Sequence, residues 1–421
     1  MSERAPFLNK TYGAYYHREQ PAPDEELTRV GPGTPCGEYL RRFWQPVAVA
    51  EELGELPRRI RILGEDLVVF RSRSGEVGLL ELHCPHRGTS LEFGLIEEQG
   101  IRCCYHAWLF GVDGRILEMP GHEDSTLKDR LCHGAYPVHE YAGLVFAYMG
   151  PPEKQPPFPI LDTFELPGYR MAVRPPSIWK CNWLQVKENS MDPAHLAYLH
   201  TLPGSEGFTE DFRALPEWDW METPLGMVYI DTRRNGERVW VRTADFILPN
   251  IHQFPPNAAP MAARNSITRP DATVWAVPLD DTHTMQIGYY RAPEGREPRR
   301  GAGFGQDDSR SYEERQRVPG DHDAQVSIHN GLSRHGLEHL TAIDRGIIMM
   351  RSMIRNGVRA VSGNMELDYP TLRDDGPIPT YCHDQMVPGY PMAETPEDDR
   401  KLLRTVAHDA VARAVREGLA A

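Results

Sequence analysis

The chain has 421 residues, of which 40% are hydrophobic and 25% are charged, so it can bury a sizeable core and exceeds the usual length of one domain. Its net charge of −14 argues against nucleic acid as the main partner, because phosphate binding needs a basic surface. The apolar runs are far shorter than the ~20 residues that cross a bilayer, and the N-terminus lacks the apolar core of a signal peptide. Seven unevenly spread cysteines do not form a disulfide framework. We therefore expect a cytoplasmic protein without a membrane segment.

The first part of the chain is predicted to be rich in β-strands. Between Arg58 and Leu82, short apolar runs are separated by Gly-Glu and Ser-Gly pairs, a pattern typical of small antiparallel strands joined by tight turns. Five prolines between residues 150 and 159 then stiffen the chain and block regular pairing, so we place a domain boundary there. The predicted parts are an N-terminal extension, an all-β domain and a second domain, over residues 1–26, 27–150 and 151–421.

The second domain is predicted to be α+β, with helices packed on one antiparallel sheet. Alternating apolar residues predict its strands over Met227–Thr232, Val239–Ile247, Ala272–Val277 and Thr284–Tyr290. Apolar residues at helical intervals predict helices over residues 323–355 and 398–419. The polar, glycine-rich stretch over residues 292–320 is expected to be a loop.

Two pairs of cysteine and histidine form the first candidate metal site. Cys84 and His86 stand two residues apart, and Cys103 and His106 follow with a spacing of three. Each pair lies at a predicted turn between strands, so two loop tips can hold one metal centre. Two thiolates and two neutral imidazoles are the ligands of a Rieske [2Fe-2S] cluster. A Cys2His2 zinc site is the alternative, although the spacing differs from common zinc patterns.

A second candidate metal site contains His195 and His200. Two histidines five residues apart do not share one face of an ideal helix, so the helix there is expected to be irregular or to end between them. Two histidines and one carboxylate form the facial triad of non-haem Fe(II) sites, which leaves coordination positions open for O₂. The residues alone leave the carboxylate undecided among Asp321, Asp323 and Asp344.

Both motifs resemble those of a known family. The segments Cys-Pro-His-Arg-Gly and Cys-Tyr-His-Ala-Trp resemble the Rieske domain, and residues 188–200 resemble the mononuclear-iron motif of Rieske oxygenases. Thr89 and Tyr105 stand where respiratory electron carriers of the family usually bear extra cysteines, so the pattern is similar to the oxygenase branch. The resemblance covers residues 27–355. It implies an N-terminal Rieske domain followed by a catalytic domain of helix-grip-like fold.

The resemblance also implies a role for each residue of the first motif and for an aspartate of the second. The cluster ligands would be Cys84, His86, Cys103 and His106, because the family spacing selects Cys103 and leaves Cys104 as a packed thiol. Asp192 would bridge to a cluster histidine of the neighbouring subunit and fix the tautomers of both imidazoles.

The ligands of the mononuclear iron follow from the same resemblance. His195 and His200 would supply the two imidazoles. Members similar to phthalate dioxygenase carry an aspartate upstream of a segment like residues 339–344, and counting back from that segment points to Asp323. We therefore expect Asp323 as the third ligand, with Asp321 as the second choice, and Asp344 as the N-terminal residue of a helix.

The electron donor is expected to be a separate protein. The glycine-spaced run at residues 301–305 neither follows a strand nor opens a helix, so it is interpreted as a loop and not as a dinucleotide fingerprint. No second iron–sulfur motif is present in the sequence. The resemblance therefore implies an NAD(P)H-dependent reductase, with or without a ferredoxin, and a homotrimer whose head-to-tail contacts close into a ring.

The pattern is most similar to aryl O-demethylases and to phthalate dioxygenase, both of which act on aromatic carboxylates. This implies oxygenation with O-demethylation of a methoxylated aromatic acid, with cis-dihydroxylation as the alternative. Four arginines that could pair with a carboxylate are more typical of solvated surface charges, and none is assigned to the site: Arg170, Arg174, Arg242 and Arg264. A hypothesis of a different class is a Rieske electron-transfer protein without catalytic iron.

Overall fold

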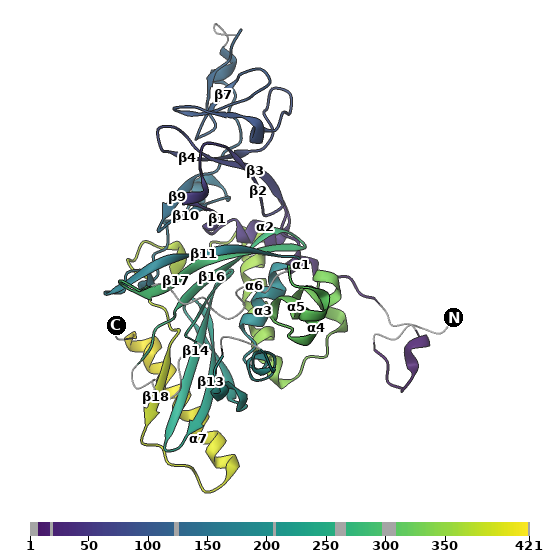
Figure 1. Ribbon diagram of the computed structural model, residues 1–421, viewed down its shortest axis with the longest axis vertical. Helices are drawn as coiled ribbons and strands as arrows, with labels where there is room; N and C mark the ends of the chain where they lie inside the picture. The colour runs from purple at the N-terminus through teal and green to yellow at the C-terminus, as the bar shows by residue number, and fades with distance from the viewer. Residues whose placement is uncertain are drawn as a thin grey trace.

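A computed structural model describes residues 7–16, 20–121, 126–204, 208–256, 267–296 and 309–419. The N-terminal β domain stands on one end of a larger domain that contains the long strands and the helices (Figure 1). Arg264 and the expected loop at residues 301–305 lie outside the described residues. Within the described ranges, no helix combines the length and the apolar composition needed to span a membrane.

The N-terminal domain is built from three small antiparallel sheets, which confirms the predicted β-rich part. The strands predicted between Arg58 and Leu82 form the sheet β2-β3-β4, with bounds Arg58–Ile62, Glu65–Arg71 and Val77–Glu81. The second sheet, β5-β6-β7-β8, consists of Leu95–Ile96, Gly100–Arg102, Leu109–Gly111 and Ile116–Glu118. The third sheet, β1-β10-β9, consists of Gln45–Val49, Leu144–Ala147 and Val138–Tyr141.

The larger domain contains one antiparallel sheet in the order β11-β17-β16-β15-β14-β13-β12, with β18 paired to β14. All four predicted strands are confirmed in it as β13, β14, β16 and β17, and consecutive residues are buried over most of each strand. The strand bounds in chain order are Tyr169–Trp179, Glu217–Thr223, Gly226–Asn235, Arg238–Ile247, Ile251–Phe254, Ala272–Asp280, His283–Pro293 and Asp384–Pro388.

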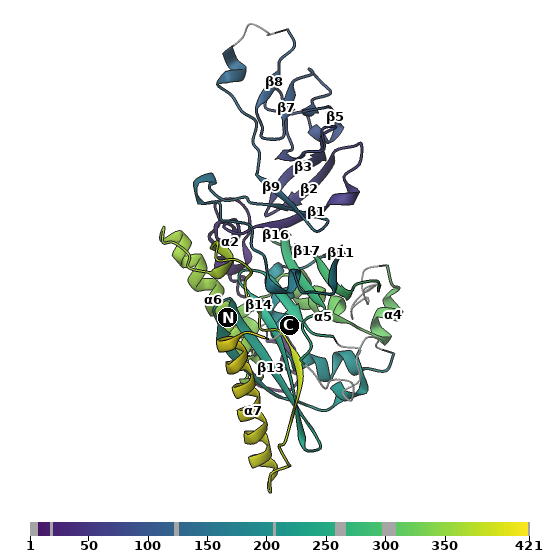
Figure 2. The same cartoon turned by 90° about the vertical axis from the view of Figure 1, so that its left-hand side faces the viewer.

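Helices cover this sheet, and the last of them was predicted within two residues. Helix α7 lies along β13 and β14 (Figure 2), and the hydroxyl of Thr395 caps its first turn. The expected loop over residues 292–320 contains the short helix α4, which begins at a capping box of Ser311 and Glu314. The helices α1 to α7 span Glu25–Thr28, Pro35–Leu40, Trp183–Ser190, Tyr312–Arg317, Asp321–Ser327, Arg345–Ser362 and Pro396–Glu417.

The prediction of one continuous helix over residues 323–355 is wrong. The structure has two helices there, α5 and α6, separated by a segment that turns at His329, Asn330 and Gly331, all with left-handed backbone angles. Gly331 approaches the chain so closely that a Cβ atom would lie 2.4 Å from the carbonyl oxygen of Lys180. Apolar spacing continues through this break, so the pattern alone did not reveal it.

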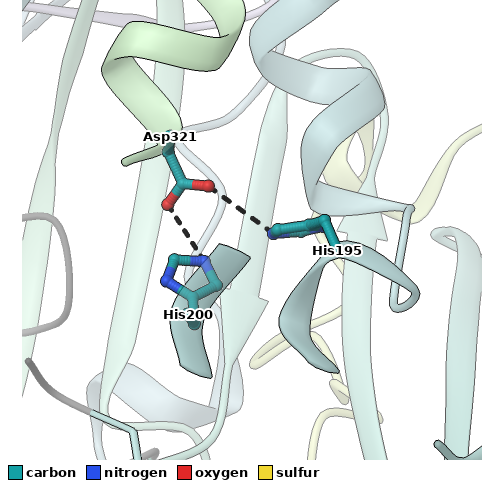
Figure 3. Close-up of side chains that lie close together, drawn as sticks. All are labelled: His195, His200 and Asp321. Carbon is teal, nitrogen blue, oxygen red and sulfur yellow. Dashed lines mark ion pairs between the residues drawn. The ribbon is translucent and has the colours of Figure 1, made fainter. Parts of the chain in front are cut away.

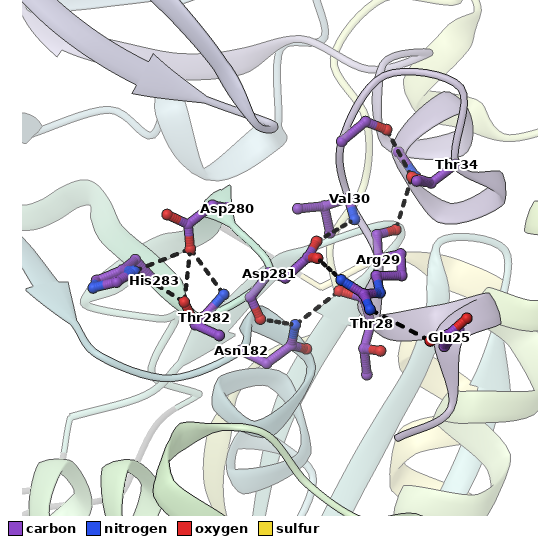
Figure 4. Close-up of polar contacts among 12 residues, drawn as sticks. Glu25, Thr28, Arg29, Val30, Thr34, Asn182, Asp280, Asp281, Thr282 and His283 are labelled. Carbon is purple, nitrogen blue, oxygen red and sulfur yellow. Dashed lines mark hydrogen bonds and ion pairs between the residues drawn. The ribbon is translucent and has the colours of Figure 1, made fainter. Parts of the chain in front are cut away.

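The segment before β1 packs on the larger domain (Figure 4). The side-chain amide of Asn182 donates to the carbonyl oxygens of Thr28 and Asp281, at 2.9 and 2.7 Å. The carboxylate of Asp281 in turn accepts from the backbone nitrogen of Val30 at 2.9 Å and from Arg29 at 2.7 Å. The segment before β1 therefore fixes the turn that precedes α3, the helix that leads into the second candidate metal site.

Replacing Asn182 with alanine is expected to destabilise the fold by about 2–4 kcal/mol. Its Oδ1 atom accepts from the backbone nitrogen of Leu184 and caps α3, and its amide satisfies two carbonyl groups in the interior. Chemical denaturation measures the change. Glu25→Ala, which removes an exposed ion pair beside the same contacts, is the control and should cost less than about 0.5 kcal/mol. Equal effects of the two changes would contradict the role given to Asn182.

Candidate functional site

Two loops of the N-terminal domain have the same backbone hydrogen bonds. In the first, the nitrogen of Cys84 donates to Thr89 at 2.9 Å, and that of Gly88 donates back to Cys84 at 2.8 Å. In the second, the nitrogen of Cys103 donates to Trp108 at 2.9 Å, and that of Ala107 donates back to Cys103 at 3.0 Å. The loops follow β4 and β6, and a left-handed residue closes each one. The sequence therefore builds two matching turns.

These loops bring the predicted cluster residues together. The side chains of Cys84 and Cys103 are buried in the same small core, and the rings of His86 and His106 have centroids 4.5 Å apart. Burial and the neighbouring Cys103 thiol raise the pKa of Cys84 to about 11, so a bound metal cation is what would make this sulfur a thiolate. Cys104 is exposed. The donor set of two thiols and two imidazoles fits a Rieske cluster.

The second site begins where α3 ends. This helix stops at Ser190, and the two histidines lie beyond it on separate one-turn 3₁₀ helices, His195–Ala197 and Leu199–Thr201. The expected irregularity of the chain is thereby confirmed. Because the 3₁₀ turns replace a regular helix, two histidines five residues apart can face one point.

Three side chains converge at this point (Figure 3). One carboxylate oxygen of Asp321 lies 3.6 Å from Nε2 of His195, and the other lies 3.3 Å from Nε2 of His200. All three ligand atoms lie within 4.8 Å of one another. Burial would raise the pKa of Asp321, but a hydrogen bond with His200 and the charges of the two histidines lower it to about 2. The carboxylate is thus ionised and able to bind a cation.

The position of Asp323 reverses the expected order of the two candidate carboxylate ligands, in which Asp323 came first and Asp321 second. Its side chain accepts hydrogen bonds from Arg310 and Arg315, each at 2.5 Å, and from the backbone nitrogen of Gly320. Residues two apart in a helix point in very different directions, so Asp321 and Asp323 of α5 cannot both face the histidines. Asp344 lies at the start of α6, as expected.

The ligand side chains are held by their neighbours. The carbonyl oxygen of Asp192 accepts from Nδ1 of His195 at 2.5 Å, which leaves Nε2 of His195 for a metal. The side-chain amide of Asn189 donates to Asp321 at 3.2 Å. The sequence analysis missed Asn189, and its place in the run Glu-Asn-Ser-Met-Asp-Pro was the only available signal.

A cavity of about 120 Å³ opens beside the three residues. Its wall is mainly apolar and aromatic, with Trp179, Phe208, Phe254 and Tyr290 among the lining side chains. Such a wall suits a small organic molecule. A molecule in this cavity would lie next to the candidate metal ligands.

Two of the four arginines considered from the sequence also line this cavity, Arg174 and Arg242. Interpreting Arg242 as a surface charge was wrong, since its side chain is only 1% exposed. It forms an ion pair with Asp384 at 3.3 Å and donates to the carbonyl oxygens of Pro255 and Pro256. The pairing of β14 with β18 places Arg242 and Asp384 side by side inside the fold. The local sequence around Arg242 does not indicate this pairing.

Residues 43–140 match the family model of the Rieske [2Fe-2S] domain. The chain is 42% identical to the oxygenase subunit of tert-butanol monooxygenase / tert-amyl alcohol desaturase from Aquincola tertiaricarbonis, over 92% of this chain and 87% of that protein. It is 34% identical to the oxygenase subunit of 5,5'-dehydrodivanillate O-demethylase from Sphingobium sp., over 65% of this chain and 64% of that protein. The fold is similar to that of dicamba monooxygenase bound to dicamba, with a TM-score of 0.59 and 20% identity, over 77% of this chain and 99% of that chain.

Proposed function

Because the chain belongs to the terminal oxygenases of the Rieske non-haem iron family, we propose that it monooxygenates a single-ring aromatic carboxylate and removes the methyl group of a methoxy substituent. The cofactors of the enzyme are a [2Fe-2S] Rieske cluster and one mononuclear iron. The observation that carries the proposal is the convergence of His195, His200 and Asp321 beside an aromatic cavity. An electron carrier without catalytic iron would have no use for this arrangement.

We assign the mononuclear iron to these three residues and the cluster to Cys84, His86, Cys103 and His106. Iron bound there supplies the position at which O₂ is activated. The protein's own contribution is to hold the ligands: Asn189 fixes the carboxylate of Asp321, and Asp192 fixes the ring of His195. The apolar wall keeps the substrate beside the metal ligands and limits the access of water.

The size of the cavity supports a single ring. An apolar cavity of roughly 150 Å³ holds benzene, and the cavity of about 120 Å³ beside the triad is of similar size. Aromatic side chains on the wall favour a flat substrate, and the basic residues on the wall favour one with a negative charge.

The reaction uses one O₂, two electrons and two protons. One oxygen atom enters the C–H bond of the methoxy group, and the other leaves as water. The resulting hemiacetal breaks its C–O bond to release formaldehyde and the phenol. The electrons come from NAD(P)H through a separate reductase, with or without a ferredoxin.

Formaldehyde release tests this reaction. Iron-replete enzyme with a reductase, NADH and 4-methoxybenzoate is expected to release one formaldehyde per O₂ consumed, measured by a colorimetric assay and an oxygen electrode. Benzoate, which has no methoxy group, is the control and should release none. O₂ uptake with formation of a cis-diol and no formaldehyde across methoxylated single-ring acids would contradict the proposed demethylation.

Hydroxylation of a small tertiary alcohol is the second candidate. The 42% identity with the tert-butanol monooxygenase subunit favours it, and such an alcohol also fits the cavity. Turnover of tert-butanol at a rate above that of every aromatic acid would select this function. A branched alcohol carries no charge, however, and would give Arg174 on the cavity wall no anionic partner.

We also propose that the enzyme is a homotrimer in which electrons cross between subunits near Asp192. Within one chain, β7, which follows the second cluster loop, lies at the top of the molecule in Figure 1, whereas α3 and α5 lie near its middle, with the sheet β1-β10-β9 between them in height. A neighbouring subunit is therefore the expected source of the electron. Light scattering is expected to give about three times the chain mass of 47.8 kDa, and a monomer with full turnover would contradict the arrangement.

A further inference from the structure

The sheet side of the cavity contains a buried pair of basic side chains, Lys187 of α3 and His252 of β15. The Nζ atom of Lys187 lies 2.5 Å from Nδ1 of His252. Lys187 is fully buried, and His252 lines the cavity with 9% of its surface exposed. Among the residues that the structure describes, no acidic side chain pairs with Lys187. A buried ammonium group without a counter-ion is costly, so burial lowers the pKa of Lys187 well below its usual value.

The pair fixes the orientation of the histidine. When the amine of Lys187 donates to Nδ1, the proton of the neutral imidazole lies on Nε2. His252 then has one hydrogen-bond donor left, and it is the residue of the pair that reaches the cavity. Burial and the charge of Lys187 both lower the pKa of His252, which keeps the ring neutral.

Other donors lie around the same part of the wall. Arg174 lines the cavity and donates to the carbonyl oxygen of Gln286 at 3.1 Å. The Nε1 atom of Trp179 and the Nε2 atom of Gln286 are buried and have no hydrogen-bond partner within the described chain. The acidic residues of the lining, Asp192 and Asp321, belong to the metal end of the cavity. The sheet side thus has several donors and the positive charge of Arg174, and no carboxylate lies among its described lining residues.

We propose that His252, positioned by Lys187, binds the carboxylate of the substrate and makes the enzyme selective for anionic substrates. The inference rests on the proposed function and assigns the recognition of the charged group to named residues. The carboxylate accepts from Nε2 of His252, and its charge supplies the counter-ion that Lys187 and Arg174 lack inside the cavity. A neutral substrate of the same shape would leave these groups unpaired, and a site with unpaired buried donors discriminates strongly.

Binding without turnover tests the proposal. The probes are 4-methoxybenzoate and 4-methoxytoluene, titrated by calorimetry into the oxidised, iron-replete enzyme. Wild type is expected to bind the carboxylate about 10- to 100-fold more tightly than the neutral probe. His252→Phe, which keeps an aromatic ring, and Lys187→Met, which keeps the length of the side chain, should each remove most of this preference. Their affinity for 4-methoxytoluene and their iron content should stay at the wild-type level.

Two further variants separate positioning from packing. Lys187→Gln retains a donor for Nδ1 of His252, so it should recover part of the preference that Lys187→Met loses. Lys154→Met removes a partly exposed lysine that pairs with Glu366 and does not line the cavity, so it should change neither affinity. Wild-type protein that binds both probes equally, or a preference unchanged in His252→Phe, would overturn the proposal. If the enzyme releases formaldehyde but shows no preference for the anion, the proposed demethylation stands and only this inference fails.

Discussion

Asp321→Ala is expected to abolish binding of the mononuclear iron and to lower turnover by more than about 100-fold, beyond the 10- to 100-fold that outer partners of metal ligands usually contribute. Asp321 is the carboxylate that lies within reach of both His195 and His200. Without it, two imidazoles remain, and the facial triad is incomplete. Iron content and single-turnover rate measure the effect.

Asp323→Ala is the matched control for this change. It removes an aspartate two residues away on the same helix, and it breaks the contacts with Arg310 and Arg315 and not those with the histidines. The variant is expected to lose stability by about 1–2 kcal/mol and to keep its iron. Loss of one iron in Asp323→Ala with retention in Asp321→Ala would show that the carboxylate has been assigned to the wrong residue.

Cys103→Ala is expected to lose the whole cluster and to reduce turnover with the natural electron donor to background. Cys103 is buried beside Cys84, and a Rieske cluster needs both thiolates on one of its irons. Iron should fall from about three to about one per chain, and the labile sulfide should disappear. Sulfide analysis and EPR of the reduced protein measure these losses.

The adjacent cysteine provides the control for that experiment. Cys104→Ala removes an exposed thiol one residue away, so the cluster and its EPR signal are expected to remain. A cluster that survives in Cys103→Ala but not in Cys104→Ala would reverse the assignment. Because both variants remove one thiol from the same loop, a general disturbance of the loop would affect them equally.

Much of the fold could be predicted because its signals are local. The strands β13, β14, β16 and β17 alternate apolar and polar residues along one sheet, and α7 carries its own cap and helical spacing. The two loops around Cys84 and Cys103 likewise follow from short motifs with fixed spacing.

The errors arise where distant segments decide the outcome. The break between α5 and α6 depends on the close approach of Gly331 to Lys180, which is far away in sequence. The choice between Asp321 and Asp323 depends on which face of α5 meets the histidines, and a count of residues from a downstream motif cannot fix a helix rotation. Arg242 is buried only because β18 pairs with β14 and brings Asp384 to it.

The most direct test of the central claim is iron and acid-labile sulfide analysis, with EPR, of anaerobically purified protein reduced with dithionite. Two metal centres in one chain predict about three irons and two sulfides, with a Rieske-type signal from the cluster. Zinc without labile sulfide, or two irons whose number does not change in His195→Ala, would contradict the presence of both centres.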